Sequence, residues 1–336
     1  MDPVVTKLCF SFLFSFLFTY YFIPIFIKIA YAYNIVDVPD GNIKQHHAPT
    51  PYLGGAALYL GFLGTLAMVF PFDNQFFLFL VGSTLLFYIG LVDDLISLSP
   101  LQKFAGQAIA VICFLRAGFY LKSHIFYNPW NIPISAFWML LVINAFNLID
   151  IMDGLAIVVA IFCAFNFLLI ALFMTHAAIA LLLAAMLGSF IAFFCFNKPR
   201  AQIYLGDAGS LFIGGLFSTV PFLFSWGNID PFAYMIPIVV LAIPLLETCG
   251  LICIRTWKGI PFYQPSKDHF MHYLKRKGAL EWHILLFVSV ASTIIMCATL
   301  LFINQTIATT TLVAMGVIFL LSWIYVLFMR NLFFLK

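Results

Sequence analysis

Long apolar runs separated by short polar stretches dominate the pattern of hydrophobic and polar positions along this chain. Helices of roughly 20 apolar residues span a bilayer, and about eleven runs approach that length: 4–33, 53–71, 76–92, 104–121, 134–149, 155–174, 177–196, 211–226, 231–254, 283–303 and 307–329. The alternation of apolar and polar residues that barrel strands need is absent. The pattern therefore predicts an all-α polytopic membrane protein, with residues 1–336 forming one domain.

Composition excludes a water-soluble fold. Hydrophobic residues make up 64% and charged residues 9% of the chain, against about 45–50% and about 25% in soluble domains. The expected environment is the lipid bilayer, and no nucleic-acid partner is expected. The run from Leu8 to Ala30 is too long for a cleavable signal peptide and predicts the first span. The cysteines lie in apolar runs and are expected to pack there without disulfides.

The basic residues predict an orientation. Of the 16 Lys and Arg residues, all but Lys7, Arg116 and Lys122 fall on one side of this topology. Cytoplasmic loops carry the excess of Lys and Arg. The N-terminus is therefore expected outside and the C-terminus in the cytoplasm.

Most acidic residues fall on the same predicted cytoplasmic side. Asp37, Asp40 and Glu281 are expected to be solvated loop residues, and Glu247 lies deeper in the ninth run. Acids in apolar surroundings at a membrane usually mark a functional site. Five acids with apolar flanks are therefore expected to form one: Asp93, Asp94, Asp150, Asp153 and Asp207.

Adjacent carboxylates stand where the third run ends, in the segment Gly90-Leu-Val-Asp93-Asp94-Leu. Two such groups repel each other, and a divalent cation is the usual compensation. Lys103, at the start of the next run, could also approach the pair. The alternative is an exposed acidic helix cap.

Polar residues recur at every third position at the end of the fifth run: Asn144, Asn147, Asp150 and Asp153. Residues three apart are neighbours on a helix, so this spacing predicts a curved polar stripe. Amides and carboxylates suit a sugar or a base edge, and Gly154 would let the chain turn. Hydrogen bonding between helices is the alternative.

The segment Tyr204-Leu-Gly-Asp207-Ala-Gly-Ser210 leads into the eighth run. Glycines permit close backbone approach, and the free N–H groups of a helix start favour phosphate. Asp207 could hold a metal against that phosphate. A plain N-cap is the alternative.

Two loops on the same side carry histidines and cations. Loop 34–52 contains Lys44 and His46, which could meet phosphate, and loop 255–282 contains His269, His272 and a basic run at 275–277. Both suit an anionic substrate group. The alternatives are ordinary juxtamembrane loops or an anchor to anionic lipid heads.

In combination, these motifs resemble the polyprenyl-phosphate N-acetylhexosamine-1-phosphate transferases, in order from Lys44 to His272. The resemblance implies that a UDP-linked sugar gives its sugar-1-phosphate to undecaprenyl phosphate and releases UMP, with Mg²⁺ (or Mn²⁺) as cofactor. N-acetylglucosamine is the best guess for the sugar. It also implies the start of a lipid-linked surface polysaccharide at the bacterial inner membrane, an active site facing the cytoplasm, and compatibility with a homodimer.

Residue by residue, the resemblance makes Asp207 the metal ligand. The expected catalytic residues are Asp93, Asp94 and Asp153, together with Lys103 beside the acidic pair. The expected substrate-binding residues are Lys44, His46, Asn147, Asp150, Asn197, Tyr204, His269 and His272, with Tyr204 placed to stack on uracil. The histidine loop departs from the usual His-x-His-His pattern, because Met271 occupies its middle position.

Three alternatives remain open on the sequence. The donor could be UDP-N-acetylmuramoyl-pentapeptide or another N-acetylated UDP-sugar. A polyprenyl-lipid transporter is disfavoured because transporters place their charges near the bilayer midplane. A non-catalytic scaffold is disfavoured by the intact motifs.

Overall fold

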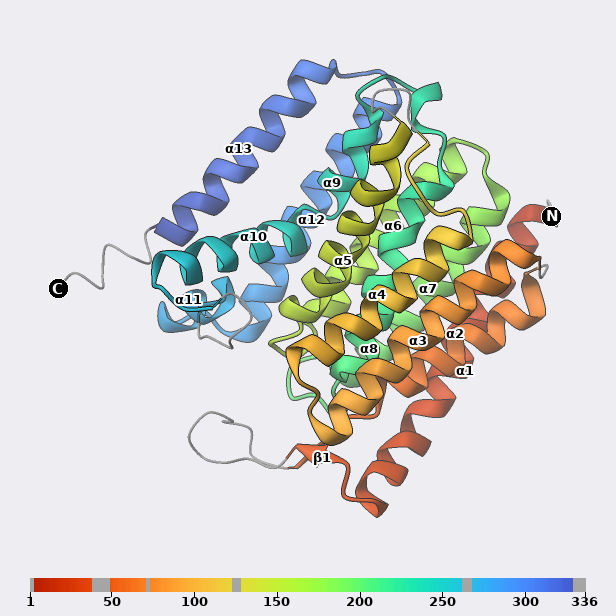
Figure 1. Cartoon of the computed structure of the whole chain (residues 1–336), viewed down its shortest axis with the longest axis vertical. Helices are drawn as coiled ribbons and strands as arrows, with labels where there is room; N and C mark the ends of the chain where they lie inside the picture. Colours follow the sequence, from red (N-terminus) through yellow and green to blue (C-terminus); the bar gives the residue numbers. More distant parts are fainter. Residues whose placement is uncertain (1–2, 38–48, 71–72, 123–127, 262–267, 329–336) are drawn as a thin grey trace. The chain divides into compact units, whose positions relative to one another are not determined.

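The computed structural model describes residues 3–37, 49–70, 73–122, 128–261 and 268–328. Lys44 and His46 lie outside these residues, so their expected roles stay predictions. The chain divides into two compact units, Met1–Phe224 and Ser225–Lys336, each treated by itself. Figure 1 labels the helices of both.

Helices build both units. The first unit contains α1 (Pro3–Ala32), α2 (Gly54–Val69), α3 (Asn74–Ile96), α4 (Pro100–Arg116), α5 (Asn131–Ile149), α6 (Leu155–Phe173), α7 (Ala177–Asn197) and α8 (Gly206–Thr219), with 3₁₀ turns at Asn128–Trp130 and Val220–Leu223. The second contains α9 (Ile236–Val240), α10 (Ala242–Trp257), α11 (Phe270–Arg276), α12 (Glu281–Ile303) and α13 (Thr309–Phe328), with 3₁₀ turns at Trp226–Asn228 and Ala233–Met235.

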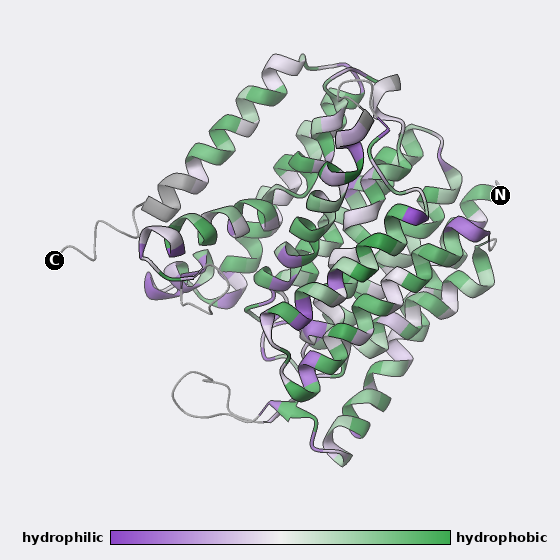
Figure 2. Cartoon of the chain, in the orientation of Figure 1, coloured by the Kyte–Doolittle hydropathy of each residue, from purple (hydrophilic) through white to green (hydrophobic). Residues whose placement is uncertain are grey.

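The helices fit a multi-pass membrane protein. Among the described residues, 6 helices are long and apolar enough to cross a membrane, or up to 7 if one bent pair counts as a span. Figure 2 shows that hydrophobic residues predominate along the helices. Each predicted apolar run overlaps a helix. The number of spans, about eleven by the length of the apolar runs, stays a prediction. The orientation of the protein in the membrane also stays a prediction.

The ninth run is broken rather than continuous. The axis bends by 72° between the segments that end at Val240 and begin at Ala242. Pro244 has no N–H to donate to the carbonyl of Val240, and a proline inside a helix kinks or breaks it. The chain resumes hydrogen bonding with the N–H of Leu245, which donates to the oxygen of Leu241 at 3.2 Å.

A short strand pair departs from the all-α prediction. Strands β1 (Val36–Asp37) and β2 (Thr50–Pro51) pair antiparallel, with Asp37 opposite Thr50. Asp37 is buried, which corrects its expected place in a solvated loop. Burial raises the pKa of the Tyr52 hydroxyl, and a hydrogen bond with Asp37 raises it further. The ends of the loop are therefore packed against the unit.

Helix α8 forms the centre of the first unit. It packs against α2, α3 and α5, while α1 packs against α2 and α7. Every residue from Ala208 to Thr219 is buried. Small residues let the backbones approach: a Cβ atom added at Gly214 would lie 2.7 Å from the Cα of Ile143 in α5. Membrane helices associate closely through such positions, and the start of α8 is thereby fixed among its neighbours.

Candidate active site at the start of helix α8

Glycines of α2 and α3 bring their backbones onto the segment that precedes and begins α8. A side chain at Gly90 of α3 would collide with the Asp207 carbonyl, and one at Gly55 of α2 would collide with Gly209. The N–H of Gly54 donates to the Tyr204 oxygen at 3.1 Å, and the N–H of Gly55 to the Leu205 oxygen at 3.0 Å. This close packing holds the start of α8 rigidly.

Asp94 of α3 caps α8 from outside that helix. Its Oδ1 accepts the N–H of Asp207 at 2.8 Å, and its Oδ2 accepts the N–H of Ala208 at 3.0 Å. The first turn of a helix leaves such donors without partners inside the helix, and Leu205 at the N-cap offers no side-chain bond. Gly206 has φ +70°, and a Cβ there would lie 2.6 Å from Asp94 Oδ2. The carboxylate therefore requires glycine at this position.

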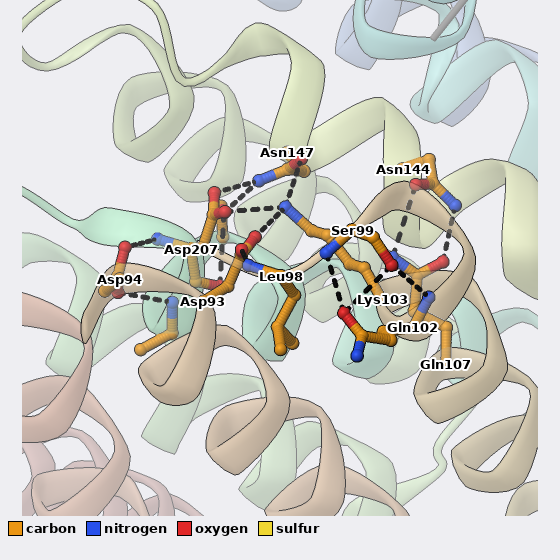
Figure 3. Close-up of polar contacts among 12 residues, drawn as sticks. Asp93, Asp94, Leu98, Ser99, Gln102, Lys103, Gln107, Asn144, Asn147 and Asp207 are labelled. Carbon is orange, nitrogen blue, oxygen red and sulfur yellow. Dashed lines mark hydrogen bonds and ion pairs between the residues drawn. The ribbon is translucent and has the colours of Figure 1, made fainter. Parts of the chain in front are cut away.

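Asp93 turns away from Asp94 toward Lys103 of α4 (Figure 3). Its Oδ2 lies 2.8 Å from Lys103 Nζ, and its Oδ1 accepts the Leu98 N–H at 2.6 Å. The expected approach of Lys103 to the acidic pair is thus observed, at Asp93. Repulsion between the adjacent acids is relieved because each carboxylate has its own donors.

Lys103 joins three helices in one cluster. Its Nζ lies 2.6 Å from Asp207 Oδ2, 2.8 Å from Asp93 Oδ2 and 3.3 Å from Asn147 Oδ1. An ammonium group has three N–H donors, so these oxygens satisfy all of them. The side chain of Lys103 is 18% exposed. The cluster is therefore a partly shielded arrangement with an accessible edge.

Asn147 of α5 orients Asp207. Its Nδ2 donates to Asp207 Oδ1 at 2.5 Å and lies 3.0 Å from Ser210 Oγ. Asn144, one turn earlier, instead exchanges hydrogen bonds with Gln107 of α4 at 2.8 and 3.3 Å. Asn144 thus fits the interhelical alternative, whereas Asn147 joins the cluster around Lys103 and Asp207. The expected substrate contact of Asn147 stays a prediction. Gln107 is a lone amide in an apolar run, a pattern that by itself does not predict a contact with Asn144.

Asp150 and Asp153 do not continue the predicted helical stripe, because α5 ends at Ile149. Asp153 Oδ2 accepts the N–H of Ala201 at 2.9 Å. Burial raises the pKa of the Asp150 carboxyl, and the nearby charges of Asp207 and Asp94 raise it further. Asp150 thus borders the cluster from the turn after α5. Gly154 has φ +75° and makes the predicted turn into α6.

Asn197 ties two loops together from the end of α7. Its Oδ1 accepts the Gly154 N–H at 3.1 Å, and its Nδ2 donates to the Ile203 oxygen at 2.9 Å. The side chain is buried. Its described contacts are thus those of a residue that positions loops, and its expected substrate contact stays a prediction.

Tyr204 lies in the segment between α7 and α8, next to Ile203. Its N–H donates to the Pro51 oxygen at 2.8 Å, and its ring centroid lies 6.0 Å from that of Tyr52 at an interplanar angle of 54°. Tyr204 is half-buried, with its backbone bonded to Pro51 and its ring beside that of Tyr52. Stacking on uracil stays a prediction.

The histidine loop lies in the second unit. His269 is buried, and its Nδ1 lies 3.1 Å from Oε1 of Glu247 in α10. The ring centroid of His272 lies 6.1 Å from that of His269. Met271 is also buried, so the departing position of the loop contributes to the core. The expected substrate contacts of both histidines stay predictions.

The donor set at the start of α8 fits Mg²⁺. Among the described residues, no three His, Cys, Asp or Glu side chains are grouped as an all-protein metal cage would need. Mg²⁺ is commonly bound by one or two carboxylates together with substrate phosphates and water. Asp207 and Asp93 supply hard carboxylate oxygens that already lie on a common cation, Lys103. The residues present therefore fit the expected ion.

The fold and this cluster together define a multi-pass membrane protein with an acid–lysine–amide site at a buried helix start. The profile of glycosyl transferase family 4 matches residues 76–225. This segment contains Asp93, Asp94, Lys103, Asn147 and Asp207. The part of the chain that builds the site is thus similar to this family.

Curated relatives agree with this family. The chain is 28% identical over 289 residues to a probable undecaprenyl-phosphate N-acetylglucosaminyl 1-phosphate transferase of Bacillus subtilis, covering 83% of this chain and 80% of that protein. It is 27% identical to the Yersinia pestis undecaprenyl-phosphate alpha-N-acetylglucosaminyl 1-phosphate transferase, covering 80% and 77%. It is 29% identical to a Mycobacterium leprae decaprenyl-phosphate N-acetylglucosaminephosphotransferase, covering 72% and 71%. The predicted resemblance is confirmed.

Replacing Asn197 by Ala is expected to lower the melting temperature of the purified protein. The change leaves the Gly154 N–H and the Ile203 carbonyl without their partner, and each unsatisfied buried group costs about 1–3 kcal/mol. Thermal unfolding in detergent measures the loss, with Gln202→Ala, at an exposed position, as the control. An unchanged melting temperature with a raised KM would instead assign Asn197 to substrate contact.

Proposed function

We propose that this protein transfers N-acetylglucosamine-1-phosphate from a UDP-sugar to undecaprenyl phosphate and releases UMP. The names of the curated relatives support this reaction class. The observation that carries the proposal for this chain is the contact of Lys103 with Asp93, Asn147 and Asp207 at the start of α8. The basic, acidic and amide groups that converge there are those that could bind a diphosphate and its metal ion.

Asp207 and Asp93 would hold Mg²⁺ in this proposal. When bound, the ion would neutralise charge that develops on the departing nucleotide phosphate. Asn147 keeps Asp207 in one orientation through the 2.5 Å hydrogen bond to its Oδ1. Asp94 keeps the backbone of Asp207 in place through the α8 amides. These contacts would hold Asp207, the proposed metal ligand, in position before substrate binds.

Lys103 would bind an oxygen of the diphosphate. Its ammonium already has three oxygen partners, so exchanging one of them for a phosphate oxygen keeps the number of hydrogen bonds constant. Asp93 would align the lipid phosphate or accept its residual proton. Because the bilayer holds that lipid at a fixed depth, the reacting groups meet with little loss of freedom.

The proposed setting is the bacterial inner membrane, where the reaction would begin a lipid-linked surface polysaccharide. We place about eleven spans in the bilayer by the length rule, with the N-terminus outside and the site facing the cytoplasm. The distribution of Lys and Arg supports this orientation. The UDP-sugar would then reach the site from the cytoplasm.

An epitope tag at the N-terminus is expected to bind antibody on intact spheroplasts. An odd number of spans places the two termini on opposite sides of the membrane. A C-terminal tag on the same protein serves as the control and should bind antibody only after permeabilisation. Protection of the N-terminal tag would overturn the proposed orientation.

UMP release by the purified protein tests the reaction directly. The mixture contains undecaprenyl phosphate, Mg²⁺ and one UDP-sugar from a panel that includes UDP-N-acetylglucosamine and UDP-N-acetylmuramoyl-pentapeptide. Release that needs both lipid and sugar, and that EDTA stops, is the expected result. Release with another sugar alone would correct the donor. A folded, monodisperse protein that releases no UMP with any donor would contradict the proposal.

A further inference from the structure

Glu247 is a buried acid in the otherwise apolar part of α10. It is 1% exposed, and its neighbours in the helix are Leu245, Leu246, Thr248 and Cys249. A carboxylate in such surroundings is costly unless hydrogen bonds satisfy it. Its partners therefore indicate what it does.

Both described partners of Glu247 lie at the start of α11. Its Oε1 is 3.1 Å from His269 Nδ1 and 3.2 Å from the backbone nitrogen of Phe270. His269 is the residue that precedes α11, and its backbone is extended there. One oxygen atom thus fixes both the histidine ring and the chain that carries it, across 22 residues of sequence.

Other charged groups are near the carboxylate. Arg255, two turns further along α10, is also buried and interacts electrostatically with Glu247 and Asp268. Asp268 Oδ1 also accepts from Lys258 Nζ at 2.8 Å. Two acidic and two basic side chains are thus grouped in this region, and the carboxylate of Glu247 lies directly at His269 Nδ1.

We propose that Glu247 is a positioning residue that selects one tautomer of His269. With Glu247 accepting from Nδ1–H, the neutral ring carries no proton on Nε2 and presents an acceptor there. Such an acceptor recognises a hydroxyl or amide N–H group, both of which an N-acetylated sugar offers. The identity of this ligand rests on the proposed function, whereas the tautomer does not.

The ring nitrogens can be observed without substrate. Protein labelled with ¹⁵N-histidine contains 7 histidines, and a His269→Asn variant assigns the signal by difference. His269 is expected to show a protonated Nδ1 and an unprotonated Nε2. His283 is the internal control, because its Nδ1 lies 3.4 Å from the Leu280 N–H as the acceptor and should be unprotonated. A wild-type His269 with unprotonated Nδ1 would overturn the proposal without any variant at Glu247.

Glu247→Ala and Glu247→Gln together separate tautomer selection from a purely structural role. In Glu247→Gln, an amide oxygen in the place of Oε1 can still accept from both His269 Nδ1–H and the Phe270 N–H, so the wild-type tautomer should remain. Glu247→Ala removes this acceptor. We expect His269 in Glu247→Ala to lose its uniformly protonated Nδ1 and KM for the UDP-sugar to rise about tenfold, the effect of one lost hydrogen bond. An unchanged tautomer and KM in a folded Glu247→Ala variant would contradict the proposal.

A double-substitution comparison completes the test. If Glu247 acts through His269, Glu247→Ala should add little to the KM of His269→Asn. Additive effects would assign Glu247 a separate role. If no UMP is released by any form, the proposed function fails, yet the wild-type nitrogen signals still decide whether Glu247 sets the tautomer.

Discussion

Asp207→Asn is expected to reduce UMP release by about 10³-fold or more while the helical fold persists. Asn lacks the charge that binds Lys103 and the proposed Mg²⁺, and loss of one preorganised charge-stabilising group costs about 10²–10³ in rate. A metal ligand should lie at the upper end of that range. Initial rates over a series of Mg²⁺ concentrations measure the effect, and circular dichroism with size-exclusion chromatography checks the fold.

Asp73→Asn is the matched control for this change. Asp73 caps α3 by accepting the N–H of Phe76 at 2.7 Å, and Asn caps helices about as well as Asp. The same loss of charge should therefore leave the rate nearly unchanged. Near-normal turnover by Asp207→Asn, with an unchanged dependence on Mg²⁺, would remove Asp207 from the metal site.

Asp94→Ala is expected to loosen the start of α8 and to reduce turnover by about 10²-fold, the cost of a misplaced charge-stabilising group. The substitution leaves the amides of Asp207 and Ala208 without acceptors, at about 1–3 kcal/mol each. Hydrogen–deuterium exchange at these two amides should accelerate. The proposed Mg²⁺ ligand would then be held less firmly, and the Mg²⁺ concentration for half-maximal rate should rise.

Asp93→Asn provides the comparison for Asp94. Asp93 contacts Lys103 and the Leu98 N–H rather than the amides of α8, so exchange at Asp207 and Ala208 should stay at the wild-type rate. If Asp94→Ala loses turnover while these amides remain protected, Asp94 acts on substrate and not through the helix.

The adjacent acids illustrate the limit of sequence reasoning. The pair Asp93-Asp94 is visible as a motif, and successive residues on a helix point about 100° apart. Which carboxylate meets Lys103 and which meets α8 depends on where α4 and α8 pack. Lys103 and Asp207 are 104 positions apart in sequence, so no local pattern reports their contact.

Burial likewise depended on distant parts of the chain. Asp37 was expected in solvent because its loop is polar, but pairing with Thr50 buries it. Glu247 was visible as an acid in an apolar run, whereas its contact with His269 requires the chain to return across α10. The break in the ninth run follows from Pro244, a local signal that the length of the apolar run concealed.

The sequence by itself determined that this is a helical membrane protein, because apolar runs of bilayer length have few other stable states. It also determined the family motifs and most of the residues now found near α8. Only the tertiary structure decided the contacts of each carboxylate: Asp94 accepts from the start of α8, Asp93 and Asp207 share Lys103, and Glu247 faces His269. The physical reason is that a hydrogen bond depends on distances of about 3 Å, and these are fixed by the packing of helices far apart in the chain.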